Sequence, residues 1–276
     1  METIEMLVTV KAYPALSKTY GEVSCIAGIE MTTGGPRWRR LYPVPFRALD
    51  GEQQFPKYQR IRLRVSKPNS DRRPETRRPD RDSIELLGEP IPSREGWARR
   101  RRFVEPLMQP SMCGVYRQQR KDRTSLGVFR PKRIVDLVIA KKDFDLAKQE
   151  IAAAWAAQPS LLAGLAKQER INQLRALEQL PYSFGYHYFC DEPKCKGHTQ
   201  SIIDWEVAQY YRRVRHSENW RDRMRERWLG NLCAPEIDTA FFVGNQHMHP
   251  TSFLILGVWW PERRPDQLAL GDLGNI

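Results

Sequence analysis

Alternating hydrophobic and polar positions run through the first 65 residues and predict a β-rich N-terminal part. Strand-forming residues fill 4–10, 23–31 and 38–44, and a Gly34-Gly35 turn joins the last two as a hairpin. The segment 61–65 alternates strictly, which buries its aliphatic residues and exposes its two arginines. Four such strands predict a small antiparallel sheet or a partly open barrel, an architecture that often presents a basic face to nucleic acid.

The pattern changes after residue 66. Residues 67–82 contain three prolines and no apolar anchor, which predicts a flexible arm. A short strand at 84–87 and a helix from Arg94 to Met108 follow, with Ser93 as the N-cap. Two further strands, 125–129 and 133–139, are expected to complete the first sheet. We therefore assign residues 1–142 to a basic β-rich domain.

Helical periodicity begins at residue 143. Apolar residues recur at helical spacing in 143–157 and again in 160–180, and Pro159 and Pro181 end the two segments, which predicts a helical hairpin. Two helices are expected further on, one capped by Asp204 and one at 217–229. Strands are expected at 239–243 and 252–260. Residues 143–276 are thus predicted to form an α+β C-terminal half, and the whole chain an α+β fold.

Cysteines and histidines cluster between residues 187 and 198. The pattern His187-x2-Cys190-x4-Cys195-x2-His198 offers thiolate and imidazole ligands on a short turn, which suits tetrahedral Zn²⁺. We expect a structural zinc knuckle with these four ligands. On a strand, however, His187 and Cys190 point to opposite faces, so other residues remain candidates for the fourth position. They are Cys233 first, and then Cys113 and His216.

Positive charge is concentrated in one region. The chain has 276 residues with 45 Lys and Arg against 33 Asp and Glu, and 28 of the basic but only 12 of the acidic residues lie between 36 and 142. Arginine matches phosphate geometry, and the interleaved aromatic residues can stack on bases. The predicted nucleic-acid contacts are Arg37, Trp38, Arg39, Arg40, Tyr42, Tyr58, Arg62, Arg64, Arg99, Arg100, Arg101 and Arg102.

Candidate catalytic residues are few. The sequence lacks the Walker A, Rossmann, nucleophile-elbow and HExxH motifs, which removes support for those four chemistries. Asp204 and Glu206 are carboxylates that could hold Mg²⁺ or Mn²⁺ in a nuclease, together with Asp71 and Glu75. Two residues apart on a helix, the first two share a metal poorly, so capping is the favoured role of Asp204. His247 and His249, in a polar loop, are weaker candidates for general bases or metal ligands.

Three functional hypotheses follow from these features. The first is a cytosolic nucleic-acid-binding protein, of DNA or RNA, that carries a structural zinc ion. The second is a metal-dependent nuclease or another nucleic-acid-processing enzyme, and the third is an assembly subunit that binds an acidic protein. No apolar run approaches the roughly 18–20 residues that span a bilayer, and the acidic N-terminus is unlike a secretory signal. We therefore expect a cytoplasmic protein with no membrane span.

Overall fold

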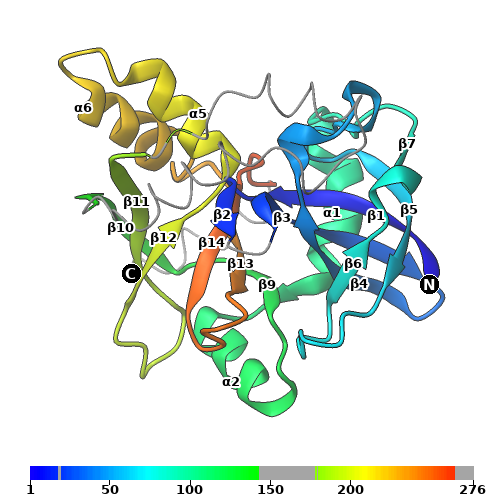
Figure 1. Ribbon diagram of the computed structural model, residues 1–276. Helices are drawn as coiled ribbons and strands as arrows, with labels where there is room; N and C mark the ends of the chain where they lie inside the picture. Colours follow the sequence, from blue (N-terminus) through cyan, green and yellow to red (C-terminus); the bar gives the residue numbers. More distant parts are fainter. Residues whose placement is uncertain (18–19, 143–177, 179, 265–276) are drawn as a thin grey trace.

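The computed structural model describes residues 1–17, 20–142, 178 and 180–264. The helical hairpin predicted at 143–157 and 160–180 lies outside these residues, apart from positions 178 and 180. The described part is a mixed α+β structure made mostly of strands with few helices (Figure 1). Among the described residues, no helix has the length and apolar character needed to cross a membrane.

Five N-terminal strands form a closed barrel. Their order is β1-β3-β4-β6-β5, and β5 pairs back onto β1. All neighbours are antiparallel except β4 and β6, which run parallel. This is the strand order of an OB-fold, a five-stranded Greek-key barrel. The strands are β1 (Glu2–Lys11), β3 (Gly21–Thr32), β4 (Gly35–Val44), β5 (Arg60–Ser66) and β6 (Thr76–Pro79), with the short β2 (Ala15–Ser17) and β7 (Glu85–Leu87) attached.

Alternation along the strands fills this barrel. Ile61, Leu63 and Val65 of β5 are buried in its core, whereas Arg62 and Arg64 point outward. The predicted hairpin between β3 and β4 is also present. The sequence pattern therefore predicted four of the five barrel strands, whereas β6 lies in the segment predicted as a flexible arm. The barrel is also closed rather than partly open and contains one parallel pair.

A second sheet contains the remaining strands in the order β10-β11-β12-β14-β13-β9-β8. Only residues 130–132 separate β9 from β10, so these two strands are the halves of one interrupted strand. One half, β10, begins the path, and the other, β9, lies next to its last strand, the two-residue β8. We expected them to complete the first sheet, but β9 pairs with the hydrophobic β13 and β10 with β11. The strands are β8 (Met108–Gln109), β9 (Leu126–Phe129), β10 (Arg133–Lys141), β11 (Tyr182–Phe189), β12 (His198–Ile202), β13 (Ala240–Asn245) and β14 (Phe253–Trp259).

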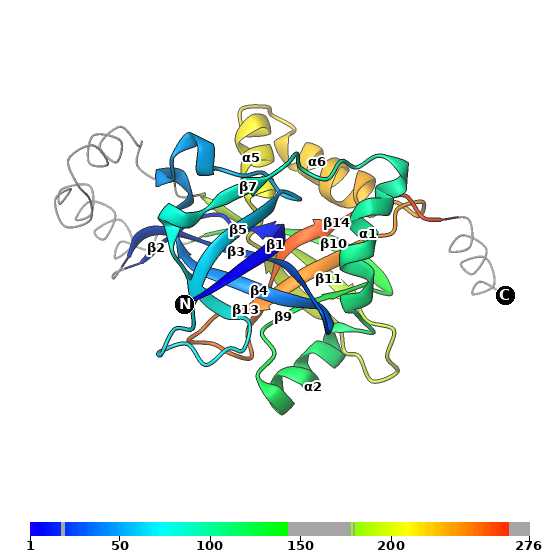
Figure 2. The same ribbon diagram turned by 90° about the vertical axis from the view of Figure 1, so that its right-hand side faces the viewer.

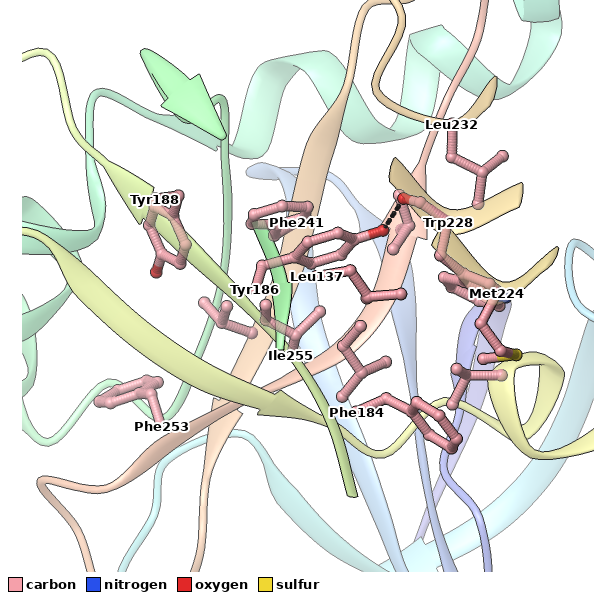
Figure 3. Close-up of a cluster of buried hydrophobic side chains, with 14 of the residues drawn as sticks. Leu137, Phe184, Tyr186, Tyr188, Met224, Trp228, Leu232, Phe241, Phe253 and Ile255 are labelled. Carbon is pink, nitrogen blue, oxygen red and sulfur yellow. Dashed lines mark hydrogen bonds between the residues drawn. The ribbon is translucent and has the colours of Figure 1, made fainter. Parts of the chain in front are cut away.

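This sheet curls around its own core. Tyr186 of β11 stacks on Phe241 of β13 with ring centroids 4.8 Å apart, although two other strands separate β11 from β13 in the sheet (Figure 3). The Tyr186 hydroxyl donates to the carbonyl of Trp228, which closes one end of the cluster. With its parallel β12 and β14, the second sheet repeats the strand order of the first. Because β9 and β10 are halves of one strand and pair with β13 and β11, the sheet closes on itself, and we call it the second barrel.

Truncation of Phe241 should destabilise this core strongly. The side chain is fully buried and contacts Phe129, Tyr186 and Tyr188. Phe241→Ala removes a large apolar volume and leaves a cavity, so we expect a loss of about 3–5 kcal/mol in the free energy of unfolding. Urea denaturation measures this value. Phe241→Leu is the matched control and should cost less than half as much, and equal losses would contradict the packing described.

Helices are short and lie outside the two barrels (Figure 2). The helix predicted from Arg94 to Met108 is restricted to α1, because Glu95, Gly96 and Trp97 all have positive φ angles near +60°, which no α-helix accommodates. The predicted N-cap of α5 is confirmed, since the Asp204 side chain accepts a hydrogen bond from the Glu206 N–H. The helices are α1 (Ala98–Val104), α2 (Met112–Asp122), α5 (Trp205–Val214) and α6 (Trp220–Arg225), the last continued by a π-helical turn (Glu226–Asn231).

The two barrels share a hydrophobic contact surface. Trp38 of β4 meets Phe242 of β13 edge to face at 6.0 Å, and Trp97 packs against Trp259 at 4.8 Å. A buried ion pair adds to this contact, because the Lys57 Nζ lies 2.7 Å from the Asp204 carboxylate. The barrels are therefore packed together rather than joined by a free linker.

Residues 67–82, predicted as a flexible arm, are tied to this body. They contain β6, and Asp71, Glu75 and Thr76 are buried. Polar contacts replace the apolar anchor that the segment lacks, because the Glu75 carboxylate accepts hydrogen bonds from the Ser125 N–H and hydroxyl. The segment thereby joins the first barrel to the second.

Candidate metal centre and basic cleft

Three thiols and one imidazole meet beside the second barrel. The ligand atoms of Cys113, Cys190, Cys195 and His198 all lie within 4.8 Å of one another. The Cys113 Sγ is 3.4 Å from the His198 Nε2, close to the edge of about 3.5 Å that a zinc tetrahedron has with bonds of 2.0–2.3 Å. This group of side chains could hold a metal ion.

Three segments bring these ligands together. Cys190 follows β11, Cys195 lies in the loop after it, and His198 begins β12. Gly197 permits the turn because its φ is +88°, and a side chain there would press against the Phe189 and His187 rings. Cys113 comes from the first turn of α2, some 77 positions earlier in the chain than Cys190.

Polar contacts fasten α2 to the ligand loop. The Ser111 hydroxyl caps α2 by accepting from the Gly114 N–H at 2.8 Å, and it also donates to the Glu192 carboxylate. Arg117, one turn further along α2, donates to both Glu192 oxygens at 2.8 and 2.9 Å. These hydrogen bonds lower the pKa of Glu192 to about 2, so its carboxylate stays ionised.

The electrostatics of the cluster suit a cation. Burial, together with the neighbouring Cys190 and Cys195, raises the pKa of the Cys113 thiol to about 12. Burial lowers the pKa of His198, which favours the neutral imidazole that ligates metals. A divalent cation would supply the charge that lets the thiols become thiolates.

The residues predicted as metal ligands are only partly the ones that meet here. His187 lies on β11 between the buried Tyr186 and Tyr188, so its ring faces outward, where its Nδ1 is 3.0 Å from the Thr199 Oγ1. Cys233, the first alternative, instead donates its thiol to the Trp228 carbonyl at 3.3 Å. Cys113 takes the fourth place.

A cleft of about 420 Å³ lies at the other end of α2. Three segments border it: the β5–β6 loop (67–75), the β13–β14 loop (246–252) and the C-terminal turn of α2 (Figure 1). The two loops occupy corresponding places in the two barrels, between the fourth and fifth strands of each. The residues that line it are Ser70, Arg72, Arg73, Gln119, Arg123, Asn245, His247 and Pro250, and Lys67 and Asp71 line a cavity beside it.

A buried polar network forms the floor of this cleft. The Asn245 carbonyl accepts from Arg73 at 2.8 Å and from Arg40 at 3.3 Å. Arg40 also donates to the Ser125 carbonyl at 2.8 Å, and the Glu75 carboxylate holds Ser125 from the other side. The network fixes both loops and the strand that follows α2, so the cleft is built on rigid parts of the molecule.

Positive charge in the cleft is largely uncompensated. Lys67, Arg72 and Arg123 are exposed, and none of them forms an ion pair with a carboxylate of the described residues. Asp71 is the only carboxylate among the lining residues, and Arg73 already neutralises it with a 2.6 Å contact. The cleft is therefore an anion-attracting site.

Asp71 should make the stability of the protein dependent on pH in the acid range. Partial burial raises its pKa, but hydrogen bonds from the Arg73 side chain and N–H lower it more, to about 2. A depressed carboxyl pKa stabilises the fold above the unfolded value of about 3.9. That contribution is lost as the pH falls from about 4 to 2.

Asp71→Asn tests this dependence. Allowing for solvent screening, we expect the variant to lose on the order of 1–2 kcal/mol at pH 7 relative to wild type. The difference should shrink toward zero below pH 3 in denaturant titrations at several pH values. A difference that is constant with pH would show that the Asp71 charge has no such role.

The twelve predicted nucleic-acid contacts do not form one surface. Arg39, Arg40 and Arg101 are buried, as are the rings of Trp38 and Tyr58, so these five cannot reach a phosphate or a base. The guanidinium groups of the three buried arginines donate instead to internal acceptors, namely Glu30, Ser125 and Asp238. Several of the rest are paired at the surface or stacked: Arg37 with Glu30, Arg62 with Glu5 and Glu85, Arg64 with Asp80, and Arg100 on Tyr58 and Trp97.

The weak catalytic candidates lie in two separate places. The Asp204 and Glu206 carboxylates lie 2.7 and 3.2 Å from the Lys57 Nζ. The Lys57 ammonium group therefore occupies the position between them that a metal ion would need. His247 and His249 are exposed in the β13–β14 loop, and the His247 Nδ1 lies 3.4 Å from Asp71. Among the described residues, the only clustered metal-type ligands are those of the Cys113 group.

The chain matches two known domain families. Residues 108–273 match the family described as domain of unknown function DUF8757, which is more than half of the sequence. The chain belongs to this family. In this DUF8757 protein, residues 2–106 also match a second domain of unknown function, DUF8758, and the two matches meet between the first barrel and the second.

Comparisons with individual proteins add little. No curated protein matches the DUF8757 chain. A solved structure described as a murine DNA binding protein bound with ds DNA is 8% identical, with 96% of this chain and 98% of that chain covered, at a TM-score of 0.27. A score this low carries no argument about the fold or the function of this chain.

Proposed function

We propose that the protein binds nucleic acid, with the sugar–phosphate backbone lying in the basic cleft between the β5–β6 and β13–β14 loops. The observation that carries this proposal is the uncompensated charge of Arg72 and Arg123 in the cleft and of Lys67 in the cavity beside it. Binding to a polyanion draws its free energy from the release of counterions by such cations. Arginines already paired with carboxylates contribute less, because the pair must first be broken.

We further propose that the Cys113 group holds a structural Zn²⁺. Three thiolates and one imidazole are soft and borderline ligands that favour zinc over magnesium or calcium. Four protein ligands leave no open position for water, which is typical of structural rather than catalytic zinc. Such ligands work only as reduced thiols, which supports the cytosolic location predicted from the sequence.

The helix α2 connects the two features. Its first turn carries Cys113 and its C-cap is Arg123, so an eleven-residue helix joins the metal centre to the cleft. A metal at one end would hold the helix in place and thereby position Arg123 at the other end. In this proposal zinc supports binding without touching the nucleic acid.

Fluorescence anisotropy of labelled DNA and RNA, measured over a salt series, tests the proposal. We expect intact strands to be bound with an affinity that falls steeply as salt rises, by a logarithmic slope of about 3 for three phosphate contacts. Gels run in parallel with Mg²⁺ or Mn²⁺ detect cleavage, which would move the nuclease hypothesis ahead. The absence of binding to both DNA and RNA at 50 mM salt would reject nucleic acid as the ligand and leave an acidic protein partner.

A further inference from the structure

A small aromatic surface lies beside the basic cleft. Tyr20 is 37% exposed, the only aromatic residue among the exposed large hydrophobic side chains of the described chain. Its ring meets that of Tyr42 edge to face at 6.4 Å, and the Arg78 guanidinium lies 6.0 Å from its centroid. Tyr42 is only half-buried. Two tyrosines and one arginine thus share an accessible site.

The strand pairing places this site at the border of the cleft. Tyr42 follows Arg40 by two positions on β4, about 7 Å along the strand, and Arg40 belongs to the polar network under the cleft. Arg78 lies on β6, which runs parallel to β4 with Leu41 opposite Arg77. The β5–β6 loop with Arg72 and Arg73 leads directly into β6. A nucleic-acid strand that leaves the cleft along β6 would pass over Tyr20 and Tyr42.

Electrostatics agree with this position. Burial raises the pKa of the Tyr42 hydroxyl, and the positive charge of Arg73 acts in the opposite direction. Arg73 lines the cleft, so its charge reaches the tyrosine site. Arg73 is therefore near enough to act on both the cleft and the Tyr42 hydroxyl.

Exposed rings beside a basic cleft favour one form of nucleic acid. Bases in a duplex are stacked on each other and present only their edges, whereas a single strand can offer base faces to aromatic side chains. Other aromatic residues predicted as stacking platforms, Trp38 and Tyr58, are buried and cannot serve. We infer that the ligand is single-stranded DNA or RNA, with phosphates at Arg72 and Arg123 and bases stacked on Tyr20 and Tyr42. This inference rests on the function proposed above.

Affinities for matched single and double strands test the inference. The full-length protein is titrated into a labelled 20-nucleotide single strand of mixed sequence, and separately into the same strand annealed to its complement. We expect the single strand to bind at least about tenfold more tightly. Tyr20→Ala combined with Tyr42→Ala should weaken single-strand binding by about thirtyfold or more and leave duplex binding within about twofold.

Tyr20→Phe combined with Tyr42→Phe is the matched control. It keeps both rings and should keep the single-strand preference, with circular dichroism confirming that all variants fold. Equal affinity for the two forms, or no effect of the alanine pair, would overturn the inference. If Arg72→Gln with Arg123→Gln still weakens binding by about ten- to a hundredfold in that case, the proposed function stands without this inference. If wild type binds neither form, both fail.

Discussion

Replacing Arg72 and Arg123 together by glutamine is expected to weaken nucleic-acid binding by about ten- to a hundredfold near physiological salt. Both side chains line the cleft without a carboxylate partner among the described residues, so their whole charge is available to phosphates. Removing two phosphate contacts should also reduce the slope of log affinity against log salt by about 2. Anisotropy titrations at four or more salt concentrations measure both effects.

Arg62→Gln with Arg64→Gln is the control for charge alone. These arginines also lie on the first barrel, but each already pairs with a carboxylate, Arg62 with Glu5 and Arg64 with Asp80. The control removes the same number of charges and should change the affinity by no more than about threefold. A similar loss in both double variants would mean that net charge, and not the cleft, determines binding.

Loss of one metal ligand should lower the stability of the protein strongly. Cys113→Ser removes the ligand that joins α2 to the β11–β12 loop, so bound zinc should fall from about one per chain to nearly none. We expect a decrease of about 3–5 kcal/mol in the free energy of unfolding and a fall in Tm of roughly 10 °C. Metal analysis and calorimetry measure these quantities.

His187→Ala separates the ligands from their neighbours. The His187 ring bonds to Thr199 and faces away from the cluster, so the variant should keep its zinc and its Tm. Cys113→Ser should also weaken nucleic-acid binding, because α2 would no longer hold Arg123 in place. Retention of zinc by Cys113→Ser, or its loss from His187→Ala, would contradict the ligand set proposed here.

Local patterns in the sequence predicted much of the fold. The strict alternation of 61–65 predicted which face of β5 is buried, and the Gly34-Gly35 turn predicted the β3–β4 hairpin. The short spacing of Cys190, Cys195 and His198 likewise predicted that these three side chains come together. In each case the interaction joins residues close in sequence, where backbone geometry alone restricts the outcome.

Long-range contacts explain what the sequence pattern missed. Cys113 reaches the candidate metal centre from α2, a helix that was not predicted from the sequence, and only the fold brings it near Cys190. The burial of Arg40 and Arg101 also depends on distant partners, Asn245 and Asp238, that neutralise or bond the guanidinium groups. A run of arginines is therefore a poor guide to an exposed basic surface when acidic and carbonyl partners come from another barrel.

Photo-crosslinking tests the central claim, that nucleic acid lies in the cleft, most directly. The protein is irradiated with a single strand that contains 5-iodouracil, and the crosslinked peptides are identified by mass spectrometry. We predict that crosslinks concentrate in residues 67–78, in the end of α2 at 119–123 and in the loop 246–252, and that they disappear with Arg72→Gln and Arg123→Gln. Crosslinks concentrated around Arg62 and Arg64, or spread evenly over the chain, would contradict this account.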